Sequence, residues 1–221
     1  RFDDQLPMTL VPAVRAREIL MYNKVAKELI HINRTALSTA DQVTYDCLNY
    51  DVQSALAMFA FNERLMPLNQ MDSVPVILAN FASGQSSQAL QTPVQYDMYL
   101  KRVAQLPAWI NQAIINMREG MRQGIVLPRS LVLSTLPQLN ALVTAHAEDH
   151  AYYAPVKNFP ADFREADKAR LTAAYRDTIT QKALPALRKL NTFMQTDYLA
   201  ASRNSSGLGV LPNGTKWYQA L

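Results

Sequence analysis

Apolar side chains recur every three or four positions over long stretches of this chain, and no stretch alternates apolar and polar residues with period two. A recurrence of this kind places the apolar side chains on one face of an α-helix. The first two stretches cover about residues 14–33 and the residues after Ser38, and the short connection between them predicts an antiparallel helical hairpin. Their apolar stripes are Ile19, Tyr22, Val25, Leu29 and Ile32 in the first, and Tyr45, Leu48, Val52, Leu56 and Phe59 in the second.

Further helices are bounded by residues that typically start or stop a helix. Ser38 and Asp41 resemble a capping box at the start of the second helix. Thr92 before Pro93 is a typical N-cap followed by a first-turn proline, and Gly124 is a typical stop. We expect a short helix over residues 75–81, long helices over about 93–123, 128–143 and 162–202, and a final helix capped by Thr215.

Two prolines lie inside the predicted long helices. Pro107 has no amide to bond back to Val103, so we expect a kink there, and we expect Pro185 to kink or split the last long helix. Long kinked helices are typical of irregular bundles. The sequence therefore predicts an all-α fold, an irregular bundle of long kinked helices, in which residues 1–221 form a single helical domain.

Composition and charge exclude several classes of protein. The chain has 221 residues, 49% of them hydrophobic, which is enough for a packed core without disulfides or metals. Its 22 basic and 18 acidic residues give a net charge of +4 and form no basic run. Because phosphate binding needs clustered positive charge, we expect no nucleic-acid partner. No apolar run approaches the roughly 20 residues that cross a bilayer, so we also expect no membrane span.

Residues suited to chemistry are sparse. Cys47 is the only cysteine, and its apolar neighbours predict a buried thiol. His146 and His150 are four apart, so on a helix they could share a zinc ion. The alternative is an exposed polar turn, which we favour because Glu148 does not stand where the HExxH motif requires it. We therefore predict no catalytic, cofactor-binding or metal-binding residue in this chain.

The C-terminal residues contain a tight-turn signal followed by two aromatic residues. Asn213 precedes Gly214, and Trp217 and Tyr218 come directly afterwards. Paired aromatic side chains beside a glycine turn can line a cleft or anchor a core, and the sequence leaves both alternatives open.

Several short blocks occur in a fixed order from about residue 38 to the end of the chain. In this order and spacing, the sequence resembles the N-terminal half of the bacterial domain-of-unknown-function family 885. The blocks are Tyr96-Asp97-Met-Tyr-Leu-Lys-Arg102, Leu106-Pro107, Met117-Arg118-Glu-Gly120, Gly124-Ile-Val-Leu-Pro128, Pro185-Ala186-Leu187, Tyr198-Leu-Ala-Ala-Ser-Arg203, Gly207-Leu-Gly-Val-Leu-Pro212-Asn-Gly214 and Trp217-Tyr218.

The resemblance implies a longer, mostly helical protein of the zinc-peptidase type. Complete members carry HExxH followed by glycine and histidine in their C-terminal half, as gluzincins do, and many are exported, often as lipoproteins. The present sequence contains no HExxH. We therefore expect it to be a trimmed N-terminal part of a longer bacterial protein, periplasmic or membrane-anchored, with any lipid anchor upstream and any zinc bound elsewhere in the complete protein.

Two hypotheses about function follow. In the first, the chain is the non-catalytic helical portion of an exported zinc-metallopeptidase-like protein and forms part of a cleft for a peptide substrate. Arg102, Asn213, Trp217 and Tyr218 are the candidate cleft residues, although a salt bridge from Arg102 to Asp97 or Glu119, or another structural ion pair, is the favoured alternative for that side chain. In the second, the chain is an independent helical binding or assembly module. Self-association is expected in either case, because separation from a larger protein exposes apolar surface.

Overall fold

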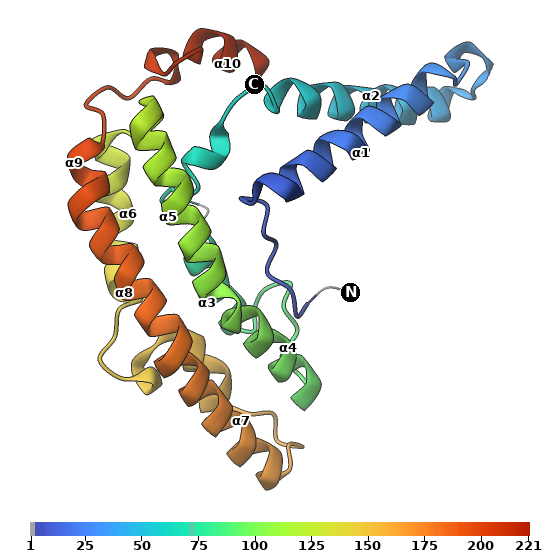
Figure 1. The fold of residues 1–221 in the computed structure, drawn as a ribbon. Helices are drawn as coiled ribbons and strands as arrows, with labels where there is room; N and C mark the ends of the chain where they lie inside the picture. Colours follow the sequence, from blue (N-terminus) through green and yellow to red (C-terminus); the bar gives the residue numbers. More distant parts are fainter. Residues whose placement is uncertain (1–2, 72) are drawn as a thin grey trace.

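The computed structural model describes residues 3–71 and 73–221, and within these residues no β-strand is formed. The all-α prediction is confirmed (Figure 1). None of the described helices is both long and apolar enough to cross a bilayer. The α-helices are α1 (Pro12–Ile30), α2 (Thr39–Met58), α3 (Val74–Ala82), α4 (Pro93–Ala104), α5 (Leu106–Gln123), α6 (Arg129–Ala141), α7 (Glu165–Thr178), α8 (Leu184–Phe193), α9 (Leu199–Ala201) and α10 (Gly214–Ala220).

Helices α1 and α2 form the predicted antiparallel hairpin, which projects as an arm from the rest of the molecule (Figure 1). Ser38 caps α2, since its hydroxyl accepts the backbone N–H of Asp41 at 3.2 Å. At the base of the arm, the Arg15 guanidinium donates to the carbonyl oxygens of Phe59 at 2.7 Å and Phe61 at 2.8 Å. These two bonds join α1 to the residues that directly follow α2.

The main core lies between α4, α5 and the long α7–α9 segment, which run side by side in Figure 1. Buried tyrosines are prominent in it, and the hydroxyls of Tyr99, Tyr152, Tyr175 and Tyr198 each have a backbone partner, as burial requires. The hydroxyl of Tyr99 donates to Leu78 O at 3.0 Å, and that of Tyr152 donates to Pro75 O at 2.8 Å. Through these bonds, α4 and the loop before α7 are both fixed against α3.

The regular α-helix is interrupted next to both prolines. Helix α4 ends at Ala104 and α5 begins at Leu106, with Gln105 at the junction and Pro107 in the first turn of α5. Pro185 lies in the first turn of α8, directly after a π-helical segment, Ile179–Ala183. The wider π turn accommodates the missing amide without ending the helix. A second π segment, Met194–Tyr198, contains no proline and was not predicted.

Most predicted helix ends are confirmed. Thr92 forms a full capping box with Gln95, and Gly124 closes α5 with φ +70°. The final helix begins one residue before the predicted cap: Asn213, with φ +58°, is the N-cap, and Thr215 lies inside α10. The turn at Asn213 therefore starts the helix.

Two predictions about side chains are wrong. Cys47 is exposed, because α2 packs against α1 through the face that carries Val52, and Cys47 lies on another face. His146 and His150 do not share a helical face, because a short 3-10 turn, Ala147–Asp149, separates them. His146 is exposed, whereas His150 is only 1% exposed, so the stretch is not a wholly exposed turn either.

Candidate functional site

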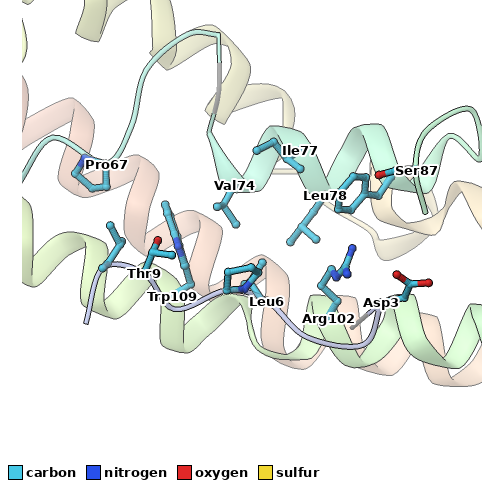
Figure 2. Close-up of a pocket in the computed structure, with 13 residues that line it drawn as sticks. Asp3, Leu6, Thr9, Pro67, Val74, Ile77, Leu78, Ser87, Arg102 and Trp109 are labelled. Carbon is cyan, nitrogen blue, oxygen red and sulfur yellow. The ribbon is translucent and has the colours of Figure 1, made fainter. Parts of the chain in front are cut away.

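A cavity of about 610 Å³ lies between the N-terminal residues and helices α3, α4 and α5 (Figure 2). We call residues 3–10 the strap, because they cross one side of this cavity before α1 begins. The walls are mainly apolar, as expected for a site that receives an apolar group. They include Leu6 from the strap, Val74, Ile77, Leu78 and Phe81 from α3, and Trp109 from α5.

Side chains at the junction of α4 and α5, and within α5, hold the strap by its backbone. The side-chain oxygen of Gln105 accepts the N–H of Leu6 at 3.1 Å, and its amide donates to Asp4 O at 2.7 Å. The buried Asn116 donates to Leu10 O at 3.0 Å. Because these bonds go to the main chain, they hold an irregular segment in place whatever its side chains are. Leu6 and Leu10 add apolar anchors, since both are buried.

Arg102 lies at the polar end of the cavity, together with Asp3 and Ser87 (Figure 2). Its Nε donates to Gln5 O at 2.9 Å and its Nη1 to Gln88 Oε1 at 2.8 Å. The guanidinium also lies over the Phe81 ring, 5.0 Å from the centroid. Burial lowers the pKa of Arg102, while the charges of Asp3 and Asp4 act in the opposite direction. The residue therefore links strap, α3 and α4 at the mouth of the cavity.

The two acids predicted as salt-bridge partners of Arg102 are paired with other cations. Asp97 pairs with Arg170, with Arg170 Nη1 2.8 Å from Asp97 Oδ1. Glu119 pairs with Arg122 one turn along α5. Both acids are thus engaged by other cations.

A second cavity, of about 570 Å³, lies at the base of the α1–α2 arm. It shares Thr9, Leu10 and Pro67 with the first, so the two adjoin at the end of the strap. Its lining is more polar and includes both signs of charge. Burial and the neighbouring charge of Arg64 lower the pKa of Arg15. The two adjoining cavities together reach from the apolar α3 wall to the arm.

The other three candidate cleft residues lie away from Arg102. Asn213 and Trp217 line a small cavity of about 130 Å³ beside Phe61. The rings of Trp217 and Phe61 stack with centroids 5.5 Å apart, and Trp217 is only 5% exposed. Tyr218 is 71% exposed. The structure thus places Trp217 as an anchor of α10 and does not bring all four residues to one cleft.

The residues of the apolar wall were not among the sequence candidates. The strap carries no motif, and its partners lie about a hundred positions later in the chain. Helix α3 did carry a signal, because its sequence VPVILANFA is apolar at seven of nine positions and contains no charge. An apolar helix of that kind is expected to be covered on several sides.

The described residues do not fit a catalytic zinc ion. No group of three or more His, Cys, Asp or Glu side chains in residues 3–71 and 73–221 could hold a metal. Both ring nitrogens of His150 are engaged, with Leu142 O 2.9 Å from Nε2 and the N–H of Tyr152 3.0 Å from Nδ1. Glu148, between the two histidines, pairs with Arg176 at 2.6 Å.

The family model described as "bacterial protein of unknown function (DUF885)" matches residues 1–221. The chain belongs to this family. The predicted resemblance to the DUF885 family is therefore confirmed. No curated protein matches the chain in sequence.

A solved structure shares the fold of this DUF885 chain. It is described as "the putative lipoprotein from Colwellia psychrerythraea" and matches with a TM-score of 0.72 and 16% sequence identity. The match covers 94% of the present chain and 36% of that protein. At this identity the similarity establishes the fold alone. The DUF885 chain thus spans about a third of the length of its structural relative.

Proposed function

We propose that this chain is the helical, non-catalytic portion of an exported, zinc-metallopeptidase-like DUF885 protein. We further propose that the 610 Å³ cavity beside the strap, which we call the groove, forms part of its substrate cleft. In this proposal the chain holds an extended peptide, and bond breaking occurs in another part of the complete protein.

The groove is the observation that supports the proposal most strongly. Its walls combine apolar side chains from α3 and α5 with a polar end at Arg102, an arrangement suited to a ligand with an apolar side chain and a polar backbone. The strap shows that this surface accommodates irregular main chain, because Gln105 and Asn116 hydrogen-bond to its backbone. A peptide substrate would present the same groups.

Zinc and export enter the proposal from the family resemblance and the structural relative. Since the described residues gather no metal-ligand set, a catalytic zinc ion would be bound by residues outside them. Zinc would supply a Lewis acid and an activated water there. Export, with or without a lipid anchor, agrees with the description of the Colwellia psychrerythraea protein.

A groove variant of the complete polypeptide tests the proposal. Ile77→Lys places a charge in the apolar wall, so cleavage of a library of internally quenched peptides should show a raised KM and little change in kcat. Val94→Lys, at an exposed position of α4, is the matched control and should leave both constants unchanged. Equal kinetics for Ile77→Lys and the wild type would exclude this groove from the substrate cleft.

The second candidate function is an independent helical binding or assembly module. Exposed apolar side chains on the α1–α2 arm favour it, among them Leu20, Ile30, Val43 and Tyr50. Patches of this kind mark contact surfaces. A complete polypeptide without zinc or peptidase activity that forms a stable complex through the arm would favour this function over the first.

A further inference from the structure

Helix α2 carries two apolar stripes, and only one of them faces α1. The stripe that contains Val52, 2% exposed, packs in the hairpin. The other consists of Val43, Cys47, Tyr50 and Met58, with the small polar Ser54 between the last two, at spacings of three and four residues that place them on one helical face. We call this second set the outer stripe.

The N-terminal part of the outer stripe is open to solvent. Val43 is 59% exposed, Tyr50 is 69% exposed, and Cys47 between them is also exposed. A helix with apolar residues on opposite faces is normally covered on both. The exposed part of the stripe therefore has the character of a contact surface.

The other end of the outer stripe already serves as an interface. Met58 packs against the cluster formed by Leu65, Leu211 and Trp217, through which α10 lies against the end of α2. Figure 1 shows α10 beside that end of α2. A partner that covered Val43, Cys47 and Tyr50 would therefore extend along α2 the packing that α10 begins at its other end.

The charged residues of α2 indicate what kind of partner would fit the outer stripe. Helix α2 contains Asp41, Asp46 and Asp51 and no Lys or Arg. By helical geometry, Asp46 and Asp51 flank the outer stripe on opposite sides. Asp46 is paired with Arg34 at 2.6 Å, whereas no cation of the described residues is paired with Asp51. Two copies of α2 placed face to face would oppose acid to acid, which argues against a symmetric dimer through this stripe.

We propose that the outer stripe of α2 is the docking surface for a further helix of the same polypeptide, one whose apolar side chains are flanked by Lys or Arg. The inference rests on the proposed function in one respect, namely that the complete protein is longer than this chain. The 36% coverage of the solved relative supports that premise.

Cys47 lies in the middle of the outer stripe and reports directly on whether it is covered. Its alkylation by iodoacetamide is followed by peptide mass spectrometry in the complete polypeptide and in residues 1–221 alone. Covered thiols react only after local opening, so we expect a rate lower by about tenfold or more in the complete polypeptide. Tyr50→Glu should restore fast alkylation of Cys47 there, whereas Val94→Glu on α4 should not.

Equal rates in the two proteins would overturn the inference, and so would a complete polypeptide no longer than this chain. Slow alkylation of Cys47 in residues 1–221 that becomes fast on dilution would show that a second copy covers the outer stripe. That result would also overturn the inference. The result is independent of zinc and peptidase activity. If Cys47 is protected but the complete polypeptide has neither zinc nor peptidase activity, the proposed function is refuted and the docking surface remains supported.

Discussion

The imidazole of His150 donates a 2.9 Å hydrogen bond from Nε2 to the carbonyl oxygen of Leu142. The proton is on Nε2 because Nδ1 accepts the backbone N–H of Tyr152 at 3.0 Å. The ring is buried, and burial lowers the pKa of His150 to about 4. Protonation of Nδ1 would remove the acceptor for Tyr152, so the native state requires a neutral imidazole.

This geometry predicts acid sensitivity between pH 6.5 and 4. The folded state has the lower pKa, so the unfolded state binds more protons as the pH falls, and stability decreases through this window. From pH 7.5 to pH 5 the loss should be roughly 2 kcal/mol for this one group. Urea unfolding of the wild type and His150→Gln measures it, and the variant should lack this part of the pH dependence. His146→Gln, at an exposed histidine, should retain it, and identical profiles for all three proteins would contradict the account.

The close packing around Gly120 predicts that a larger side chain there would destabilise the fold. A Cβ atom there would lie 2.5 Å from Ile125 O and 3.0 Å from Leu65 O, and both are backbone atoms that cannot rotate away. Gly120→Ala should therefore cost about 1–3 kcal/mol in the free energy of unfolding. Gly207→Ala is the control, because its Cβ would meet nothing within 4 Å and its φ of −69° suits alanine. Chemical denaturation of both variants decides the point, and equal stabilities would refute the close packing of α5.

The sequence predicted those parts of the fold whose signals are local. Caps, first-turn prolines and Gly124 lie within a few residues of the ends they set, so their helices are confirmed. The burial of Cys47 was wrongly predicted from its apolar neighbours, because Cys47 lies on the face of α2 opposite the predicted stripe around Val52. The groove was missed because strap and wall meet only in three dimensions: Leu6 and Gln105 are 99 positions apart.

The two hydrogen bonds of Gln105 should determine how firmly the strap is held. Gln105→Ala removes the partners of Leu6 N–H and Asp4 O, each contributing about 1 kcal/mol. Amide hydrogen exchange in residues 3–10 should become faster, while exchange in α7 should be unchanged. Gln53→Ala, at an exposed position of α2, is the control. If exchange in the strap stays as in the wild type, these bonds do not hold it.

Trp217 and Tyr218 predict opposite outcomes although they are adjacent in sequence. Trp217→Ala removes the ring stacked on Phe61 and should release α10 from α2, with a loss of about 3–5 kcal/mol for the local contact. Exchange protection across residues 214–220 should fall accordingly. Tyr218→Ala should change stability by less than about 0.5 kcal/mol, because that side chain is exposed. Similar effects of both changes would contradict the role of Trp217 as the anchor of α10.

The location of the chemistry is tested most directly by comparing peptide hydrolysis by residues 1–221 alone with hydrolysis by the complete polypeptide at equal concentration and with added zinc. We expect cleavage by the complete polypeptide and none by residues 1–221. Zinc-dependent turnover by residues 1–221 alone would contradict it, because the groove would then belong to a chain that carries its own catalytic centre.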